Sequence, residues 1–89
     1  MKPRLIDVHT HAQFAEFDND RDAVILRALD AGIWMINVGT DRHMSESAIL
    51  LASKYEVGIF ATAGLHPTGT DEEFDYDFYL NLAKNEKVV

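Results

Sequence analysis

The sequence predicts an α/β fold with a parallel sheet, a partial TIM (β/α)8 barrel of about three βα units and the start of a fourth strand. Short apolar runs alternate with longer stretches at helical spacing, the pattern of right-handed βαβ units. The repeat is roughly 28 residues long, and a barrel of about 250 residues averages roughly 31 per unit. We therefore expect residues 1–89 to form one incomplete barrel domain with a modest core.

The first unit is predicted from residues 5–32. An apolar start and alternating residues indicate a strand from Leu5 to His11, followed by a loop over residues 12–17. Asp18 and Asn19 are candidate N-caps of the first helix. Gly32 suits the position just after the helix end. The expected buried stripe of this helix consists of Val24, Ile25, Ala28 and Leu29.

The second unit has the clearest periodicity. Residues 33–38 are nearly all apolar, as expected for a strand covered on both faces. Ser45 is the candidate cap of the helix that follows. The apolar residues of that helix recur at a period of about 3.6. They are Met44, Ala48, Leu51, Ala52 and Tyr55.

The third unit is predicted to begin with a strand over residues 57–65, followed by an acidic loop over residues 68–76. A third helix is expected around Phe78 and Leu82, closing near Asn85. Residues 87–89 then open a fourth strand. The chain thus reads as about three of eight units.

Composition excludes several function classes. The content of 47% apolar and 26% charged residues is that of a globular protein and not of a disordered one. A net charge of −7 weighs against a basic groove for nucleic acid, although bound cations reverse a local field. The absence of cysteine leaves histidine and carboxylates as metal ligands. With no signal-peptide pattern and no long apolar run, we expect a cytoplasmic protein without membrane contact.

Asp7, His9 and His11 form the most informative group. In a strand they share one face, and His9 and His11 lie about 7 Å apart at their backbones. Two such imidazoles can converge on one metal ion, and Asp7 can orient a ring by accepting its other N–H. Two surface histidines on an edge strand are the alternative. The position at a strand's carboxyl end favours a metal site, because barrel enzymes place their chemistry there.

A third histidine, His66, ends the third predicted strand. Pro67 restricts it to extended geometry, so we expect its ring at the same rim as His9 and His11. A histidine that bonds a loop carbonyl is an equally weighted alternative. His43 is expected to be a solvated residue at the start of a helix.

Four motifs in order resemble the N-terminal third of a TatD-family metal-dependent deoxyribonuclease, a family of the amidohydrolase superfamily of (β/α)8 barrels. They are Leu5-Ile6-Asp7-Val8-His9-Thr10-His11, Phe17-Asp18-Asn19-Asp20-Arg21, Asn37-Val38-Gly39-Thr40 and Gly64-Leu65-His66-Pro67. The sequence departs from the usual family pattern at Val8, Ala12 and Gln13, which implies a divergent branch.

This resemblance implies a hydrolase that cleaves DNA or another phosphodiester with water activated by two divalent metals, Mg, Mn or Zn. His9 and His11 would bind one metal, and His66 would face the substrate phosphate. Asp7 would not bind the metal itself but would orient a ligand ring or pack at the strand end. The family's remaining ligands, a glutamate, two histidines and an aspartate, would lie beyond Val89. We therefore expect the 89 residues alone to be inactive.

Three alternatives stay open. A PHP-type phosphoesterase also opens with Asp-x-His-x-His, but a Ser-Asp-Gly-like turn usually follows, where residues 12–15 read Ala-Gln-Phe-Ala. Another amidohydrolase, one that cleaves amides, shares the first motif but not the motif at residues 64–67. A non-catalytic, truncated βα module would self-associate through exposed sheet edges.

Overall fold

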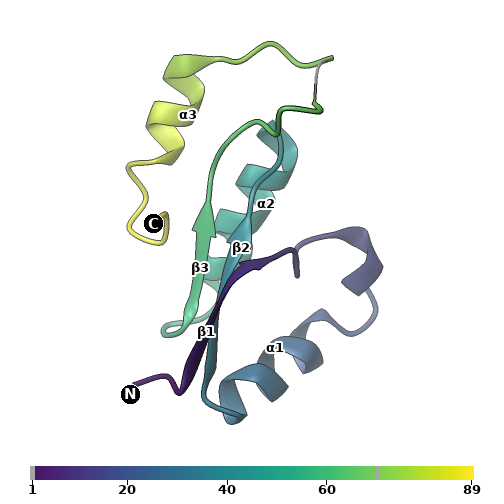
Figure 1. Ribbon diagram of the computed structural model, residues 1–89, viewed down its shortest axis with the longest axis vertical. Coiled ribbons are helices and arrows are strands. Elements are labelled where there is room, and N and C mark those ends of the chain that lie inside the picture. The colour runs from purple at the N-terminus through teal and green to yellow at the C-terminus, as the bar shows by residue number, and fades with distance from the viewer. Residues whose placement is uncertain (1, 70) are drawn as a thin grey trace.

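The computed structural model describes residues 2–69 and 71–89. Over these residues it forms a three-stranded parallel sheet in the order β1-β2-β3, with one helix after each strand (Figure 1). The predicted α/β class and strand order are confirmed. The strands are β1 (Leu5–Thr10), β2 (Ile33–Val38) and β3 (Ile59–Thr62), the helices are α1 (Arg21–Asp30), α2 (Arg42–Ser53) and α3 (Tyr76–Leu82), and a short 3₁₀ turn spans Ala15–Phe17.

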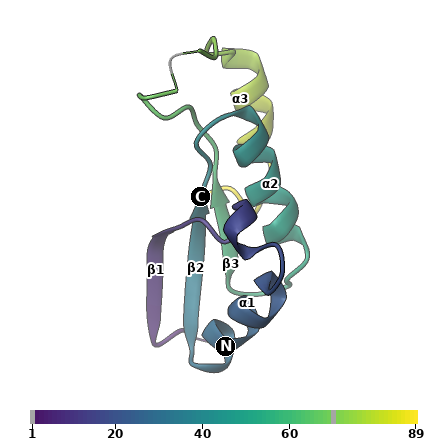
Figure 2. The same ribbon diagram turned by 90° about the vertical axis from the view of Figure 1, so that its right-hand side faces the viewer.

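The core lies between the sheet and its helices. Figure 2 shows α1 and α2 on one side of the sheet, while no described helix covers the other side. Apolar side chains from both layers are removed from water here, which drives the packing. They include Ile25 of α1, Ala48 and Ala52 of α2, Met35 of β2 and Ile59 of β3. Among the described residues, no helix is long and apolar enough to cross a membrane.

Helix α2 is the best-anchored helix. The Asp41 carboxylate accepts the backbone N–H of Met44 at 2.7 Å and thereby caps the helix N-terminus. The prediction that Ser45 is the cap is wrong, because Ser45 lies fully buried within the first turn. Its Oγ donates to the carbonyl of Gly64 at 3.2 Å and accepts the Gly64 N–H at 3.1 Å.

Two further element ends differ from the sequence predictions. Strand β3 pairs only over Ile59–Thr62, and the chain then leaves the sheet toward Gly64. Helix α1 begins at Arg21 after an Asp20 cap that makes no side-chain bond, so the capping prediction for the two preceding residues is wrong. Asp18 instead forms an ion pair with Arg21 at 2.7 Å.

The C-terminal residues, which were predicted to open a fourth strand, form a single isolated bridge. Helix α3 ends at Leu82, earlier than predicted, and a turn at Asn85 follows. Val88 then pairs in parallel with Ala61 of β3. The Ala61 N–H donates to the carbonyl of Lys87 at 2.9 Å. The edge of β3 that faces away from β2 therefore carries one parallel bridge.

Strand β1 contains an irregularity where the motif lies. Asp7 pairs with Met35, and Thr10 pairs with Asn37. Two residues of β1 therefore lie opposite a single residue of β2 between these pairs. The extra residue is a β-bulge, which interrupts the alternation of side chains. We predicted that Asp7, His9 and His11 share one face because side chains alternate along a regular strand. The register shift breaks that alternation, so the prediction no longer follows from the strand geometry.

Candidate functional site

The carboxyl ends of the three strands open into a hollow of about 610 Å³. It brings together His9, His11 and His66, the histidines singled out from the sequence. His43 is exposed and lines a different hollow of about 370 Å³, with Arg21 and Lys54. The hollow of the three histidines is also lined by Phe14, Val38, Thr40, Asp41, Leu65, Thr68, Gly69, Asp71 and Glu72.

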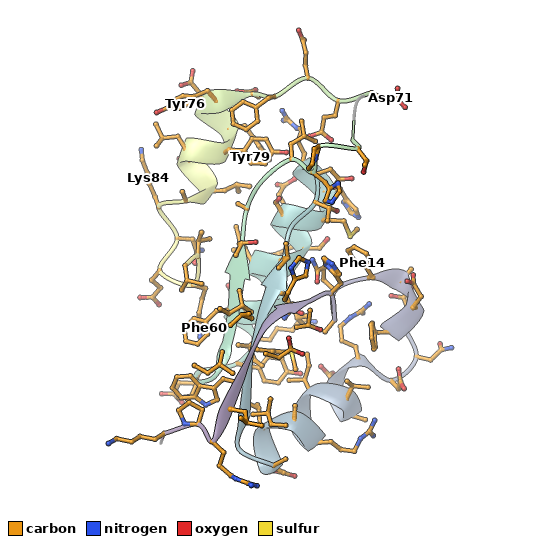
Figure 3. All side chains as sticks on the ribbon, viewed as in Figure 1. Phe14, Phe60, Asp71, Tyr76, Tyr79 and Lys84 are labelled. Atoms are coloured by element: carbon orange, nitrogen blue, oxygen red, sulfur yellow. The ribbon has the colours of Figure 1, made fainter. Side chains whose placement is uncertain are left out.

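The ring of His11 is fixed by two contacts. Its Nδ1 lies 3.0 Å from the carbonyl oxygen of Val38. A carbonyl only accepts, so Nδ1 carries the proton and the Nε2 of a neutral ring keeps a free lone pair. The ring also stacks on Phe14, with centroids 4.4 Å apart and 18° between the planes. Figure 3 shows Phe14 beside the end of β1. His11 is therefore oriented as metal-binding histidines are.

His9 lies next to His11. The two ring centroids are 5.2 Å apart and the planes are nearly perpendicular, at 83°. Ring nitrogens lie about 2.0–2.1 Å from a bound metal, so rings at this separation are close enough to share one ion. The Asp7 carboxylate accepts the backbone N–H of His9 at 3.1 Å. Asp7 therefore stabilises the backbone at the bulge.

The loop after His11 is tied to β2. The Ala12 N–H donates to Asn37 Oδ1 at 2.8 Å, and Gln13 Nε2 donates to the Val38 carbonyl at 2.9 Å. Both side chains are buried, yet Gln13 Oε1 and Asn37 Nδ2 have no hydrogen-bond partner. Arg21, the first residue of α1, also binds this loop, because its Nε donates to the Ala12 carbonyl at 2.7 Å. These polar contacts hold the loop in place together with Ala12, which is buried in the hydrophobic core.

The His66 ring has the opposite tautomer to the His11 ring. Its Nδ1 accepts the backbone N–H of Thr68 at 3.2 Å and lies 2.8 Å from the Thr68 hydroxyl. A backbone N–H only donates, so Nδ1 is the acceptor and Nε2 carries the proton. The backbone N–H of His66 donates to the carbonyl of Thr40 at 2.8 Å, which holds this segment against the end of β2. The exposed ring can thus donate a hydrogen bond to an anion.

Two of the carboxylates that line the hollow, those of Asp41 and Glu72, already have partners. Asp41 caps α2, and Glu72 Oε1 accepts the Arg42 backbone N–H at 3.1 Å and the Tyr79 hydroxyl at 3.0 Å. In residues 2–69 and 71–89, no three histidine, aspartate or glutamate side chains are grouped to hold a metal ion. The closest pair of potential nitrogen ligands in the hollow is formed by His9 and His11, whose rings are in contact.

Sequence reasoning missed the partners that hold these rings. The Val38 carbonyl is a backbone group and leaves no trace in residue types, and the contact of Ser45 with Gly64 joins segments that are far apart in sequence. The bond from the Ala12 N–H to Asn37 Oδ1 is the one contact here that the sequence could have indicated. An asparagine in an otherwise apolar strand was the signal for it.

Comparison with known proteins identifies the family. Residues 6–89 match the family described as TatD related DNase. The chain belongs to this family. A TatD protein of Citrobacter koseri, named as a 3'-5' ssDNA/RNA exonuclease, is 39% identical over 88 residues, covering 96% of this chain and 34% of that protein.

Two further TatD relatives carry the same name. The one from Salmonella typhimurium is 33% identical over 88 residues, covering 96% of this chain and 34% of its own length. The one from Cronobacter sakazakii is 41% identical over 64 residues, covering 71% of this chain and 24% of its own length. The chain thus spans between a quarter and about a third of these relatives, in the segment that carries the histidine hollow.

Proposed function

We propose that this TatD-family chain supplies the first metal-binding part of a nuclease that hydrolyses phosphodiester bonds in single-stranded nucleic acid. The observation that carries the proposal is the orientation of His11, whose Nδ1 bond to Val38 leaves Nε2 free beside His9. The names of the relatives, 3'-5' ssDNA/RNA exonucleases, support the substrate class.

The donor set fits a divalent metal in part. Two neutral imidazoles suit Zn²⁺ and are also found with other first-row metals, while carboxylates suit Mg²⁺ and Mn²⁺. When bound, such a metal supplies an activated water and neutralises charge on the phosphate. His9 and His11 would hold it, and the Val38 carbonyl would keep the His11 tautomer that binds. The other ligands would come from the part of the enzyme that these residues do not include.

His66 would hold the phosphate. Its Nε2 carries the proton because Nδ1 accepts the Thr68 N–H, so an N–H faces outward as a donor. The Ser45 and Thr40 contacts fix the segment from which the ring projects. His66 thereby contributes binding and orientation and leaves the metal pair unobstructed.

The sheet order supports the barrel. Consecutive parallel strands, each followed by a helix on one side, are the arrangement of a (β/α)8 barrel, whose active sites lie at the carboxyl ends of the strands. The side of the sheet without helices would then be the barrel interior. We infer that this chain forms its first three units.

Calorimetric titration with Zn²⁺ at neutral pH tests the metal site. We expect weak binding by the unmodified chain, because two ligands and water complete the coordination. His9→Ala and His11→Ala should each remove most of it, since one imidazole has no chelate partner. His43→Ala is the matched control, because His43 lines the other hollow. Equal affinity in all four proteins would contradict the proposal.

Nuclease activity should depend on the missing units. We expect no cleavage of single-stranded DNA by the 89 residues alone. A chimera joining them to the remaining two-thirds of the Citrobacter koseri relative should be active. His9→Ala and His66→Ala in that chimera should lower activity, the first through metal loss and the second with metal binding retained. An active His9→Ala chimera would contradict the assigned role.

A second candidate function is a self-associating βα module. It is favoured by exposed apolar residues on the edge strand β1, where Leu5 is 65% and Val8 66% exposed. Sedimentation over a range of concentrations tests it. Self-association that a charge at position 8 (Val8→Lys) abolishes would support an interface at this edge, and a monomer at all concentrations would exclude it.

A further inference from the structure

Phe74 and Tyr79 form a parallel aromatic stack in the region of α3. Their ring centroids are 4.9 Å apart, with 1° between the planes. Tyr79 is 6% exposed, whereas Phe74 is 57% exposed. One face of the Phe74 ring thus rests on a buried tyrosine, and the ring remains largely open to solvent.

The support beneath Phe74 is held on several sides. The Tyr79 hydroxyl donates to Glu72 Oε1 at 3.0 Å, and the Phe78 ring packs edge-on against Tyr79 at 5.3 Å. The guanidinium of Arg42 lies 3.9 Å from the centre of the Phe78 ring. Figure 3 shows Tyr79 on the side of α3 that faces the preceding loop, and Tyr76 on the outer side. Phe74 therefore stacks on a ring of fixed orientation.

The stack is joined to the histidine hollow through Glu72. This carboxylate lines the hollow together with His9, His11 and His66. It also accepts the backbone N–H of Arg42 at 3.1 Å, at the start of α2. The same side chain thus forms part of the hollow's wall and anchors the aromatic stack.

We propose that Phe74 is a stacking platform for one unpaired base of a single-stranded nucleic acid whose phosphate lies in the histidine hollow. The proposal rests on the proposed nuclease function. Aromatic rings bind the faces of all bases, so the contact would be tolerant of sequence. In a duplex both faces of each base are covered by neighbouring bases, so the occupant is single-stranded.

The local charge restricts what Phe74 can bind. Asp71, Glu73 and Asp75 flank it in sequence and repel a phosphate backbone. The base face is neutral, so stacking is the contact this surface permits. The contribution of Phe74 to binding should therefore require that a base is present, whichever base it is. It should change little with salt concentration, unlike contacts to phosphates.

Fluorescence anisotropy with two labelled probes tests the platform. The probes are an oligothymidylate of about ten nucleotides, within the usual site size of roughly 4–16, and an abasic strand of equal length. In Zn²⁺, the unmodified chain should bind the oligothymidylate more tightly. Phe74→Ala should weaken that binding by roughly 5- to 150-fold and leave abasic binding unchanged. Phe74→Trp should retain it.

Tyr76→Ala is the matched control, because Tyr76 follows Phe74 closely in sequence but is 67% exposed on the outer side of α3. It should bind both probes as the unmodified chain does. Equal binding of the two probes by the unmodified chain, or equal losses in Phe74→Ala and Tyr76→Ala, would overturn the platform. Circular dichroism melting of each variant identifies a folding defect, and the Phe74→Trp result then decides.

His9→Ala separates this proposal from the proposed function. It should abolish Zn²⁺ binding and leave the ratio of oligothymidylate to abasic affinity unchanged. A chain that fails to bind Zn²⁺ but shows the Phe74 effect would refute the metal site and keep the platform. A chain that binds Zn²⁺ without a preference between probes would do the reverse.

Discussion

Strands β1 and β2 pair with each other, yet they differ sharply in burial. Met35 and Asn37 of β2 are buried beneath the helices, whereas Leu5 and Val8 of β1 are mostly exposed. Strand β2 has neighbours on both edges, while β1 has one. The histidines proposed to bind metal are nevertheless on and just after β1. The proposed metal ligands thus lie at the end of the less buried of these two strands.

This difference shows how the site is positioned. The end of β1 is held by directional bonds to β2, from Ala12 to Asn37 and from His11 and Gln13 to the Val38 carbonyl. Buried hydrogen bonds fix orientation more strictly than apolar contacts do. Strand β2 and its helices therefore provide the stability, and β1 provides the ligands. The following predictions test this division of roles.

The largest expected effect is the contrast between Ile25→Ala and Val8→Ala. Ile25 is fully buried, so its truncation should lower the free energy of unfolding by about 2–5 kcal/mol. Val8 is 66% exposed, and its truncation should change the free energy of unfolding by less than about 0.5 kcal/mol. Urea denaturation measures both. Similar losses would mean that β1 packs as tightly as the helical layer.

Gly39→Ala should be the next largest. An added Cβ would lie 2.6 Å from Ser45 Cα and 2.7 Å from the Thr62 carbonyl oxygen, and these are backbone atoms that cannot rotate away. We expect a loss of about 1–3 kcal/mol by urea denaturation. Gly64→Ala is the control, because no atom lies within 4 Å of its added Cβ. If Gly39→Ala matches this control, the close approach of β2 to α2 is not required.

The two helix caps should differ by a smaller amount. Asp41 accepts the Met44 N–H, so Asp41→Ala should cost about 0.5–2 kcal/mol. Asp20 occupies the same position of α1 without a side-chain bond, so Asp20→Ala should cost only a few tenths of a kcal/mol through the helix dipole. Thermal unfolding of both variants checks the order. A larger loss in Asp20→Ala would reverse the ranking of the two helices.

The last effect is absent at neutral pH and appears only in alkali. Burial and the adjacent Asp22 carboxylate raise the pKa of Tyr55 to about 12, and burial with Glu72 raises the pKa of Tyr79 to about 12. In the unfolded chain both ionise near pH 10, so the folded state keeps protons that the unfolded state releases. This stabilisation is complete below about pH 10 and is lost as the pH rises toward about 12.

Urea midpoints measured from about pH 9 to about pH 12 test this dependence. The midpoint should fall across the window, and Tyr55→Phe and Tyr79→Phe should each flatten the fall. Tyr79→Phe also removes the hydroxyl that bonds Glu72. An unchanged slope in both variants would assign the alkaline loss to other groups.

Much of the fold was predictable because it depends on local patterns. The bounds of β2 follow from a run that is apolar except for Asn37, and the buried face of α2 follows from the spacing of Ala48, Leu51 and Ala52. The bulge in β1 and the early end of β3 were not predictable, because pairing with a neighbouring strand decides them. The gathering of His9, His11 and His66 around one hollow followed from strand ends alone.

The chemical roles are less accessible to sequence. His11 and His66 are the same residue type, yet a carbonyl partner and an N–H partner give their rings opposite tautomers. Such partners are backbone groups present at every position, so no residue pattern marks them. The metal and phosphate roles accordingly stay proposals.

The bridge between Ala61 and Val88 bears on the order of folding. Each strand pairs with the strand that precedes it in the chain, so every new unit meets an edge that is already formed. Closure of short sequential loops costs little entropy, and domains emerge from the ribosome N-terminus first. The sheet of the described residues can therefore form during synthesis one strand at a time, from β1 through β2 to β3, and the bridge at Val88 can close as soon as β3 is in place.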